Sequence, residues 1–226
     1  MSEPKILDRS PLSKILLLVL LLFLLGGAAV PSYIKGKWHW KEPPTVPGLK
    51  KLQELQGKGI KVPGWETNQQ VTIQAGGRKW LLHELSQGNQ KALLLLRSQR
   101  GSTEQPQVEW MDINGYWRWE PDADIGSEFT VDSAPVNARY FRGITQGQTY
   151  AVMQWYAFPD GGHPAASHWF WRDRFYQLSG NREPWVAVCI IVPIEPFGDI
   201  ENVRPLMESL GKTVQAALMA GPLKRE

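Results

Sequence analysis

The sequence has almost no cysteine and no excess of charge of either sign. Its 226 residues include one cysteine, Cys189, so no intrachain disulfide can form and the fold must be stable through its core alone. The 25 Lys and Arg residues nearly balance the 22 Asp and Glu residues, which leaves a net charge of +3. A balance this close gives no electrostatic argument for a nucleic-acid partner.

Motifs of known chemistry are missing as well. The four histidines form no His-x-x-x-His pair and no cluster with cysteine, so we expect no metal site. The sequence contains no P-loop, no Gly-x-Ser-x-Gly and no dinucleotide-binding fingerprint. Cys189 lies between Val188 and Ile190 in a very apolar run, which favours a buried structural thiol over a nucleophile. We therefore expect no cofactor and no self-sufficient enzyme active site.

A long uncharged stretch over residues 15–34 stands near the N-terminus. Twenty residues in a helix span about 30 Å, the thickness of the hydrocarbon core of a bilayer. Basic residues precede this stretch, as in a signal peptide, but Tyr33, Trp38 and Trp40 resemble an aromatic belt at a membrane surface. These features favour a retained membrane anchor (or uncleaved signal) over a cleaved segment.

This interpretation divides the chain into four parts. Residues 1–14 form a basic cytoplasmic tail, 15–34 a transmembrane anchor that contacts lipid, 35–47 a Pro-rich spacer, and 48–221 a single globular domain. A short basic tail before an apolar run is the usual geometry of export. We therefore expect a single-pass protein of the cytoplasmic (inner) membrane, with its domain on the periplasmic side.

Strand patterns precede helix patterns within the expected domain. We predict strands over 71–75, 79–85, 92–96, 108–113, 116–120, 136–142, 149–158 and 185–194, and helices over 49–55, 165–178 and 200–219. Gly76-Gly77 and Asn114-Gly115 predict tight hairpin turns. This order predicts an α+β fold, in which helices pack on one face of a mainly antiparallel sheet.

Residues 160–174 form the candidate interaction surface. Asp160 and His163 belong to a glycine-rich turn that opens a helix, where backbone N–H groups hold an anion or simply cap the helix. The helix then carries more aromatic and cationic side chains than one face can bury, and Trp and Arg are enriched at interface hot spots. We expect the face of His168 and Arg172 to remain exposed. The candidate residues are Asp160, His163, His168, Trp169, Trp171 and Arg172.

Much of the chain after residue 34 resembles the cyanoexosortase B system-associated proteins of cyanobacteria. The likeness is carried by Trp38-His39-Trp40, Pro63-Gly64-Trp65, Trp169-Phe170-Trp171 and the runs 108–115, 139–143, 149–157 and 184–200. None of these strings is a motif of known chemistry. The resemblance implies a non-enzymatic accessory protein of a cyanoexosortase, a multi-pass membrane transpeptidase in protein-sorting systems that accompany exopolysaccharide export.

Two other classes of function stay open from the residues. An exported glycan-binding module would use Trp110, Trp117 and Trp119, because tryptophans that alternate along a hairpin can stack on sugars; a packed sheet face is the other interpretation of these residues. A hydrolase or transferase would use an unfamiliar site near Asp160, His163 and His168.

Overall fold

The computed structural model describes residues 11–28, 43–196 and 198–225. The chain divides into two compact units, residues 1–43 and residues 44–226. The first unit contains the helix α1 (Pro11–Ala28), whose apolar side chains from Ile15 to Leu24 are exposed. The second unit contains all the other helices and strands of the described chain.

The predicted transmembrane anchor over 15–34 is wrong. Of the helices in the described residues, none is long and apolar enough to cross a membrane. Residues 29–34 of the predicted anchor lie outside the described residues. We also predicted a single-pass protein of the inner membrane with a periplasmic domain, and this prediction is wrong for the same reason. Residues 1–10 and 29–42, which hold most of the predicted tail and spacer, lie outside the described residues.

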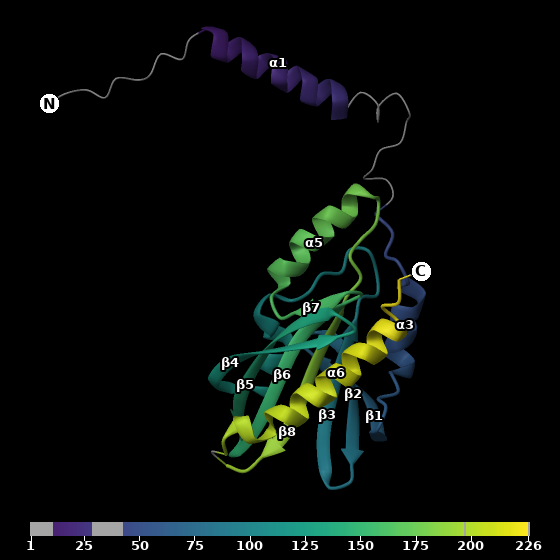
Figure 1. Ribbon diagram of the computed structural model, residues 1–226, viewed down its shortest axis with the longest axis vertical. Coiled ribbons are helices and arrows are strands. Elements are labelled where there is room, and N and C mark those ends of the chain that lie inside the picture. The colour runs from purple at the N-terminus through teal and green to yellow at the C-terminus, as the bar shows by residue number, and fades with distance from the viewer. Residues whose placement is uncertain (1–10, 29–42, 197, 226) are drawn as a thin grey trace, which may run out of the picture. The chain divides into compact units, whose positions relative to one another are not determined.

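An eight-stranded sheet forms the centre of the second unit (Figure 1). Its strands are paired in the order β1-β2-β3-β8-β6-β7-β5-β4, and β6 also pairs with β5. Among the named strands, only β5 and β7 run parallel, through the single pair Val136 and Gly162. The predicted α+β class with a mainly antiparallel sheet is confirmed. The strands are β1 (Glu66–Ala75), β2 (Arg78–Gln87), β3 (Gln90–Ser98), β4 (Glu120–Val131), β5 (Ala134–Thr145), β6 (Gln148–Phe158), β7 (Gly161–His163) and β8 (Val186–Ile194).

Helices cover both faces of this sheet, so the prediction that they pack on one face is wrong. On one face lie α3 (Leu49–Lys58) and α6 (Arg204–Ala220), and on the other lie η1 (Val108–Trp110), α4 (Met111–Trp117) and α5 (Ala166–Leu178). A further short helix, η2 (Ile200–Val203), leads into α6. The reason is visible in β8, which is apolar on both of its sides. Val188 and Ile190 join the core under α3 and α6, whereas Cys189 and Ile191 join the core on the other side.

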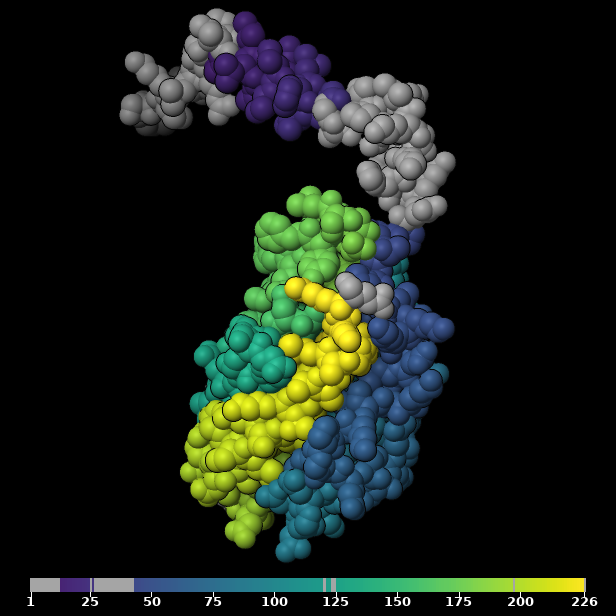
Figure 2. Space-filling model, turned by 45° about the vertical axis from the view of Figure 1, so that its right-hand side comes forward, coloured from purple at the N-terminus to yellow at the C-terminus, as the bar shows by residue number. Residues whose placement is uncertain are grey.

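The face covered by α3 and α6, which we call the closed face, is tightly packed. Figure 2 shows α6 in yellow with blue residues on one side of it and teal residues on the other. Gly211 permits the close approach of α6, because a Cβ atom there would lie 3.1 Å from the ring of Phe129. Val46 and Leu223 are buried in the same core, so the packed unit includes residues on both sides of the predicted 48–221 range.

The predicted hairpin over 108–120 is also wrong, because residues 108–117 are helical. Gly115 has no positive φ, and the side chain of Asn114 donates to the backbone oxygen of Glu109 instead of forming a turn. Trp110 and Ile113, three residues apart, are both buried against the sheet, so tertiary packing overrides the Asn-Gly signal. In contrast, the Gly76-Gly77 hairpin turn is confirmed, with φ values of 55° and 72°.

Candidate functional site

The face covered by η1, α4 and α5, which we call the open face, carries most of the exposed apolar side chains of the second unit. The described residues of the second unit include eight exposed large hydrophobic residues. Seven of them belong to these three helices, and the eighth, Ile125, lies on the edge strand β4. The seven are Val108, Met111, Tyr116, Phe170, Trp171, Phe175 and Leu178. Large exposed apolar patches on a protein mark sites that bind another molecule.

Helix α5 displays three of these side chains along one line. Trp171, Phe175 and Leu178 follow at i, i+4 and i+7 and are 64%, 71% and 85% exposed. We call them the α5 stripe. Phe170 lies beside the stripe, with the guanidinium of Arg174 4.8 Å above its ring. Of the three residues of the stripe, only Trp171 is among the candidates singled out from the sequence.

The inner side of α5 is held by polar contacts more than by apolar packing. Of its 13 residues, only Trp169 and Asp173 are buried. Trp169 donates from Nε1 to the backbone oxygen of Glu183 at 3.0 Å. The buried carboxylate of Asp173 accepts from Nε of Arg182 at 2.7 Å and from the backbone N–H of Glu183 at 3.0 Å. These bonds fix α5 to the chain that enters β8 and leave its outer side free.

Asp160 and Arg172 belong to an ion network beneath this helix. Arg172 donates to Asp160 and, at 3.0 Å, to the buried carboxylate of Glu183, while Arg225 donates to Asp160 at 2.8 Å. Burial raises the pKa of Glu183 to about 7, although the charge of Arg172 opposes this shift. Arg172 therefore faces the domain, and not the exposed side on which the sequence placed it. No local sequence pattern could reveal that Glu183 binds Arg172 or that Arg225 binds Asp160, because the fold alone brings these residues together.

His163 and His168 stack on each other, with ring centroids 4.3 Å apart. Burial lowers the pKa of both, and the nearby His163 and Arg172 lower that of His168 further. Nδ1 of His163 accepts from the backbone N–H of Ala165 at 3.0 Å. Across the described part of the chain, no hydrogen bond joins Asp160 to either histidine and no group of three His, Cys, Asp or Glu residues could hold a metal ion.

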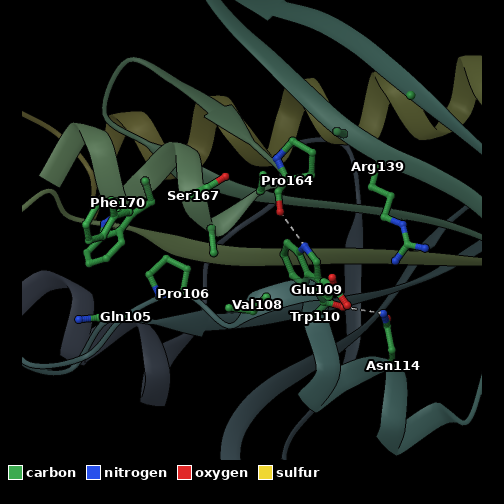
Figure 3. A pocket seen from close by; sticks show the side chains of 15 residues that line it. Gln105, Pro106, Val108, Glu109, Trp110, Asn114, Arg139, Pro164, Ser167 and Phe170 are labelled. Atoms are coloured by element: carbon green, nitrogen blue, oxygen red, sulfur yellow. Dashed lines mark hydrogen bonds between the residues drawn. The ribbon is translucent and has the colours of Figure 1, made fainter. Parts of the chain in front are cut away.

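A hollow of about 920 Å³ lies next to the stripe on the open face. Figure 3 shows Phe170 and Ser167 at one end and Arg139 at the other, with Val108 and Trp110 between them. The backbone here is strained, since Glu109 and Trp110 have φ values of 53° and 56°. Trp110 is held by a bond from its Nε1 to the backbone oxygen of Pro164 at 2.9 Å. Strain of this kind clusters at functional sites. The sequence missed the hollow because residues 108–120 were interpreted as a hairpin.

The tryptophans of the glycan-binding alternative are mostly covered. Trp110 and Trp119 are buried, and Trp117 is half-buried and stacks on Trp119 with 5.8 Å between ring centroids. A sugar needs an open ring face to stack on. Only Trp117 of the three retains any such surface.

The six candidate residues thus occupy three settings. Trp169 is in the core and Trp171 belongs to the α5 stripe. Asp160 and Arg172 lie in the ion network, where both are half-buried, and half-buried His163 stacks on His168, which is exposed as expected. No protein-family model matches this chain, and no curated protein matches its sequence.

Proposed function

We propose that this protein is a non-enzymatic accessory protein that binds a partner protein through the α5 stripe. The observation that carries the proposal is the asymmetry of α5, whose inner side is fixed by hydrogen bonds while its outer side presents Trp171, Phe175 and Leu178 to solvent. An amphipathic helix normally turns its apolar side to its own core. Here the large apolar side chains point the other way, which suits a helix that contacts another protein.

The free energy gained by covering the α5 stripe is consistent with a docking surface that also uses contacts around the stripe. An aromatic side chain buries about 150–250 Å². With about two thirds of that area exposed, Trp171 and Phe175 would each contribute about 3 kcal/mol when covered, at about 25 cal/mol per Å². Association itself costs at least about 4 kcal/mol, so the neighbouring Phe170 and the hollow beside it would have to contribute as well.

The resemblance names the partner in this proposal. It implies a cyanoexosortase, a multi-pass membrane transpeptidase, which the accessory protein would hold, supply with substrate or stabilise. The inner side of α5 supports a binding role over a catalytic one. Asp160 and Arg172 are engaged in ion pairs, and His163 accepts a backbone hydrogen bond.

Co-purification tests the proposal directly. The full chain would be expressed together with a cyanoexosortase encoded beside it, and the amount of partner retained on the tagged chain would be measured. We expect Trp171→Ser with Phe175→Ser to reduce retention by at least about tenfold, because hot-spot side chains contribute 2 kcal/mol or more each. Circular dichroism would show that the variant is folded.

Lys212→Ala serves as the matched control, since Lys212 is an exposed residue of α6 on the closed face. Its retention of the partner should equal that of the natural chain. Equal retention by the double variant of α5 would contradict the proposal and place any interface elsewhere. The absence of an exosortase-like gene near this one would contradict the choice of partner, but not the docking role of α5.

A further inference from the structure

Arg97 on β3 is a buried cation without a hydrogen-bond acceptor. Its side chain points to the open-face side of the sheet, and neither Nη1 nor Nη2 has a partner among the described residues. The nearest carboxylate oxygen, Oδ2 of Asp112, lies 3.8 Å from Nη1, too far for a hydrogen bond. That oxygen already accepts from Nε1 of Trp80 at 3.1 Å. A buried guanidinium with unpaired N–H groups is costly, so the native state requires a further acceptor here.

A second unpaired donor lies beside Arg97. Trp185 is fully buried, its ring lies 5.0 Å from the Arg97 guanidinium, and its Nε1 has no acceptor in the described chain. Gln99 is bound to the same residue, because its backbone N–H donates to the backbone oxygen of Trp185 at 3.2 Å. The side-chain oxygen of Gln99 is the one unpaired acceptor of this group. Unpaired donors therefore outnumber unpaired acceptors.

We propose that a small oxyanion, a phosphate or carboxylate group, binds to Nη1 and Nη2 of Arg97 and to Nε1 of Trp185. The fork of N–H groups on a guanidinium matches two oxygens of such an anion, and hydrogen bonds between charged partners are the strongest kind available. The buried carboxylate of Asp112, 3.8 Å from Nη1, offsets part of the charge of Arg97 but accepts none of these hydrogen bonds. One water molecule has two lone pairs and accepts from at most two of the N–H groups, whereas an anion with several oxygens can accept from all three nitrogens. This site is separate from the α5 stripe and does not depend on the docking role.

Charges of both signs act on Arg97. Burial lowers the pKa of Arg97 first of all and the charge of Arg78 lowers it further, whereas the charges of Asp112 and Glu104 raise it. Arg78 and Glu104 line a hollow of about 340 Å³ together with residues between Thr103 and Met111. Arg78 is therefore a second cation near the proposed anion.

Phosphate binding to the full-length chain tests the site. Heat unfolding would be followed at millimolar sodium phosphate and at sodium chloride of equal ionic strength, with titration calorimetry for the affinity. We expect a saturable rise of the unfolding temperature with phosphate, as for any ligand that binds only the folded state. A general salting effect does not saturate, and chloride would produce none of the specific shift.

Two variants tie the response to the site. Trp185→Phe removes the Nε1 donor but keeps an aromatic ring, and Arg97→Lys keeps the charge but removes the fork; each should weaken phosphate binding by at least about tenfold. Arg118→Lys, on an exposed arginine of the same face, should leave it unchanged. A phosphate response no larger than that of chloride would overturn the proposal and assign the unpaired donors to water. Unaltered affinity in both site variants would overturn it too.

Discussion

The two faces of the sheet are covered by helices of opposite character. On the closed face, α6 buries six of its 17 residues, and a cluster from α3, α6 and six strands surrounds them. On the open face, α5 buries two of its 13 residues, one of them an aspartate. The closed face therefore supplies apolar stability, and the open face holds its helix with directed polar bonds.

Backbone strain and unpaired polar groups follow the same division. Three non-glycine residues with positive φ, Glu109, Trp110 and Arg118, lie directly before or after α4 on the open face. The other three, Asp132, Ser133 and Gln146, lie in hairpin turns, where such angles are expected. The unpaired donors of Arg97 and Trp185 also belong to the open-face side. The strained residues and the exposed apolar side chains therefore share one face, although both faces cover a buried core.

The largest effect should come from truncating an aromatic side chain of the closed face. Trp155 is fully buried, packs edge-on against Phe129 and donates from Nε1 to Gln215 at 2.8 Å. Trp155→Ala should cost about 3–5 kcal/mol in the free energy of unfolding, measured with urea. Trp171→Ala, a change of the same type on the open face, should stay within about 0.5 kcal/mol. Similar losses in the free energy of unfolding for the two variants would contradict the expected difference between the closed and open faces.

The buried carboxylate that holds α5 should give the next largest effect. Asp173→Ala leaves Arg182 without its ion pair and should cost about 3 kcal/mol. Hydrogen exchange should show faster opening of the α5 amides than of those in α6, because the lost bonds join α5 to the rest of the unit. Equal acceleration in both helices would mean that Asp173 supports the whole fold and not α5 alone. Glu54→Ala, which breaks an exposed pair with Lys58, should change little.

The sequence was a good guide where local signals and tertiary packing agree. The hairpin at Gly76-Gly77, the strand that became β8 and the helices that became α5 and α6 follow from turn chemistry and periodicity. The sequence was a poor guide where the burial of side chains against distant parts of the chain determines the local structure. The segment 108–117 is helical because Trp110 and Ile113 reach the core, and β4 escaped notice because an edge strand with few apolar residues has a weak pattern.

The candidate surface over residues 160–174 includes the helix that carries the α5 stripe, but local patterns did not show how that helix is turned. The density of Trp and Arg in 160–174 did predict a surface with exposed aromatic residues. It could not predict that Arg172 would turn inward, since Glu183 and Asp160 approach it from other elements. Such distant partners determine which side of an aromatic-rich helix is buried, and residue spacing alone does not predict them.

Acidity should act through His83 and through Glu183 in opposite directions. Burial under α3 lowers the pKa of His83, so the unfolded chain binds more protons below pH 6.5 and stability falls as the pH falls through that range. Burial raises the pKa of Glu183 to about 7 from 4.5, so the unfolded chain loses its proton first and stability falls as the pH rises from about 4.5 to 7.

Two variants separate these contributions to the pH profile of the free energy of unfolding. His83→Phe should reduce the loss on the acid side, and Glu183→Gln should reduce the loss as the pH rises towards 7. The two profiles should therefore depart from the natural one with slopes of opposite sign. Profiles that depart in the same direction would show that His83 or Glu183 is not buried in the folded chain.

Among the buried positions, the smallest effect should come from Cys189, whose strand neighbour offers an internal control. Cys189 and Ile190 are adjacent in β8, are both fully buried and face opposite sides of the sheet. Burial raises the pKa of the thiol to about 12, which leaves it uncharged and unreactive at neutral pH. Cys189→Ala removes one sulfur atom and should cost on the order of 1 kcal/mol, whereas Ile190→Ala should cost about 2–5 kcal/mol because it opens a larger cavity under α6. A thiol reagent should modify the natural chain only as fast as it unfolds. Rapid labelling of the folded chain, or a loss from Cys189→Ala as large as that from Ile190→Ala, would contradict a purely structural thiol.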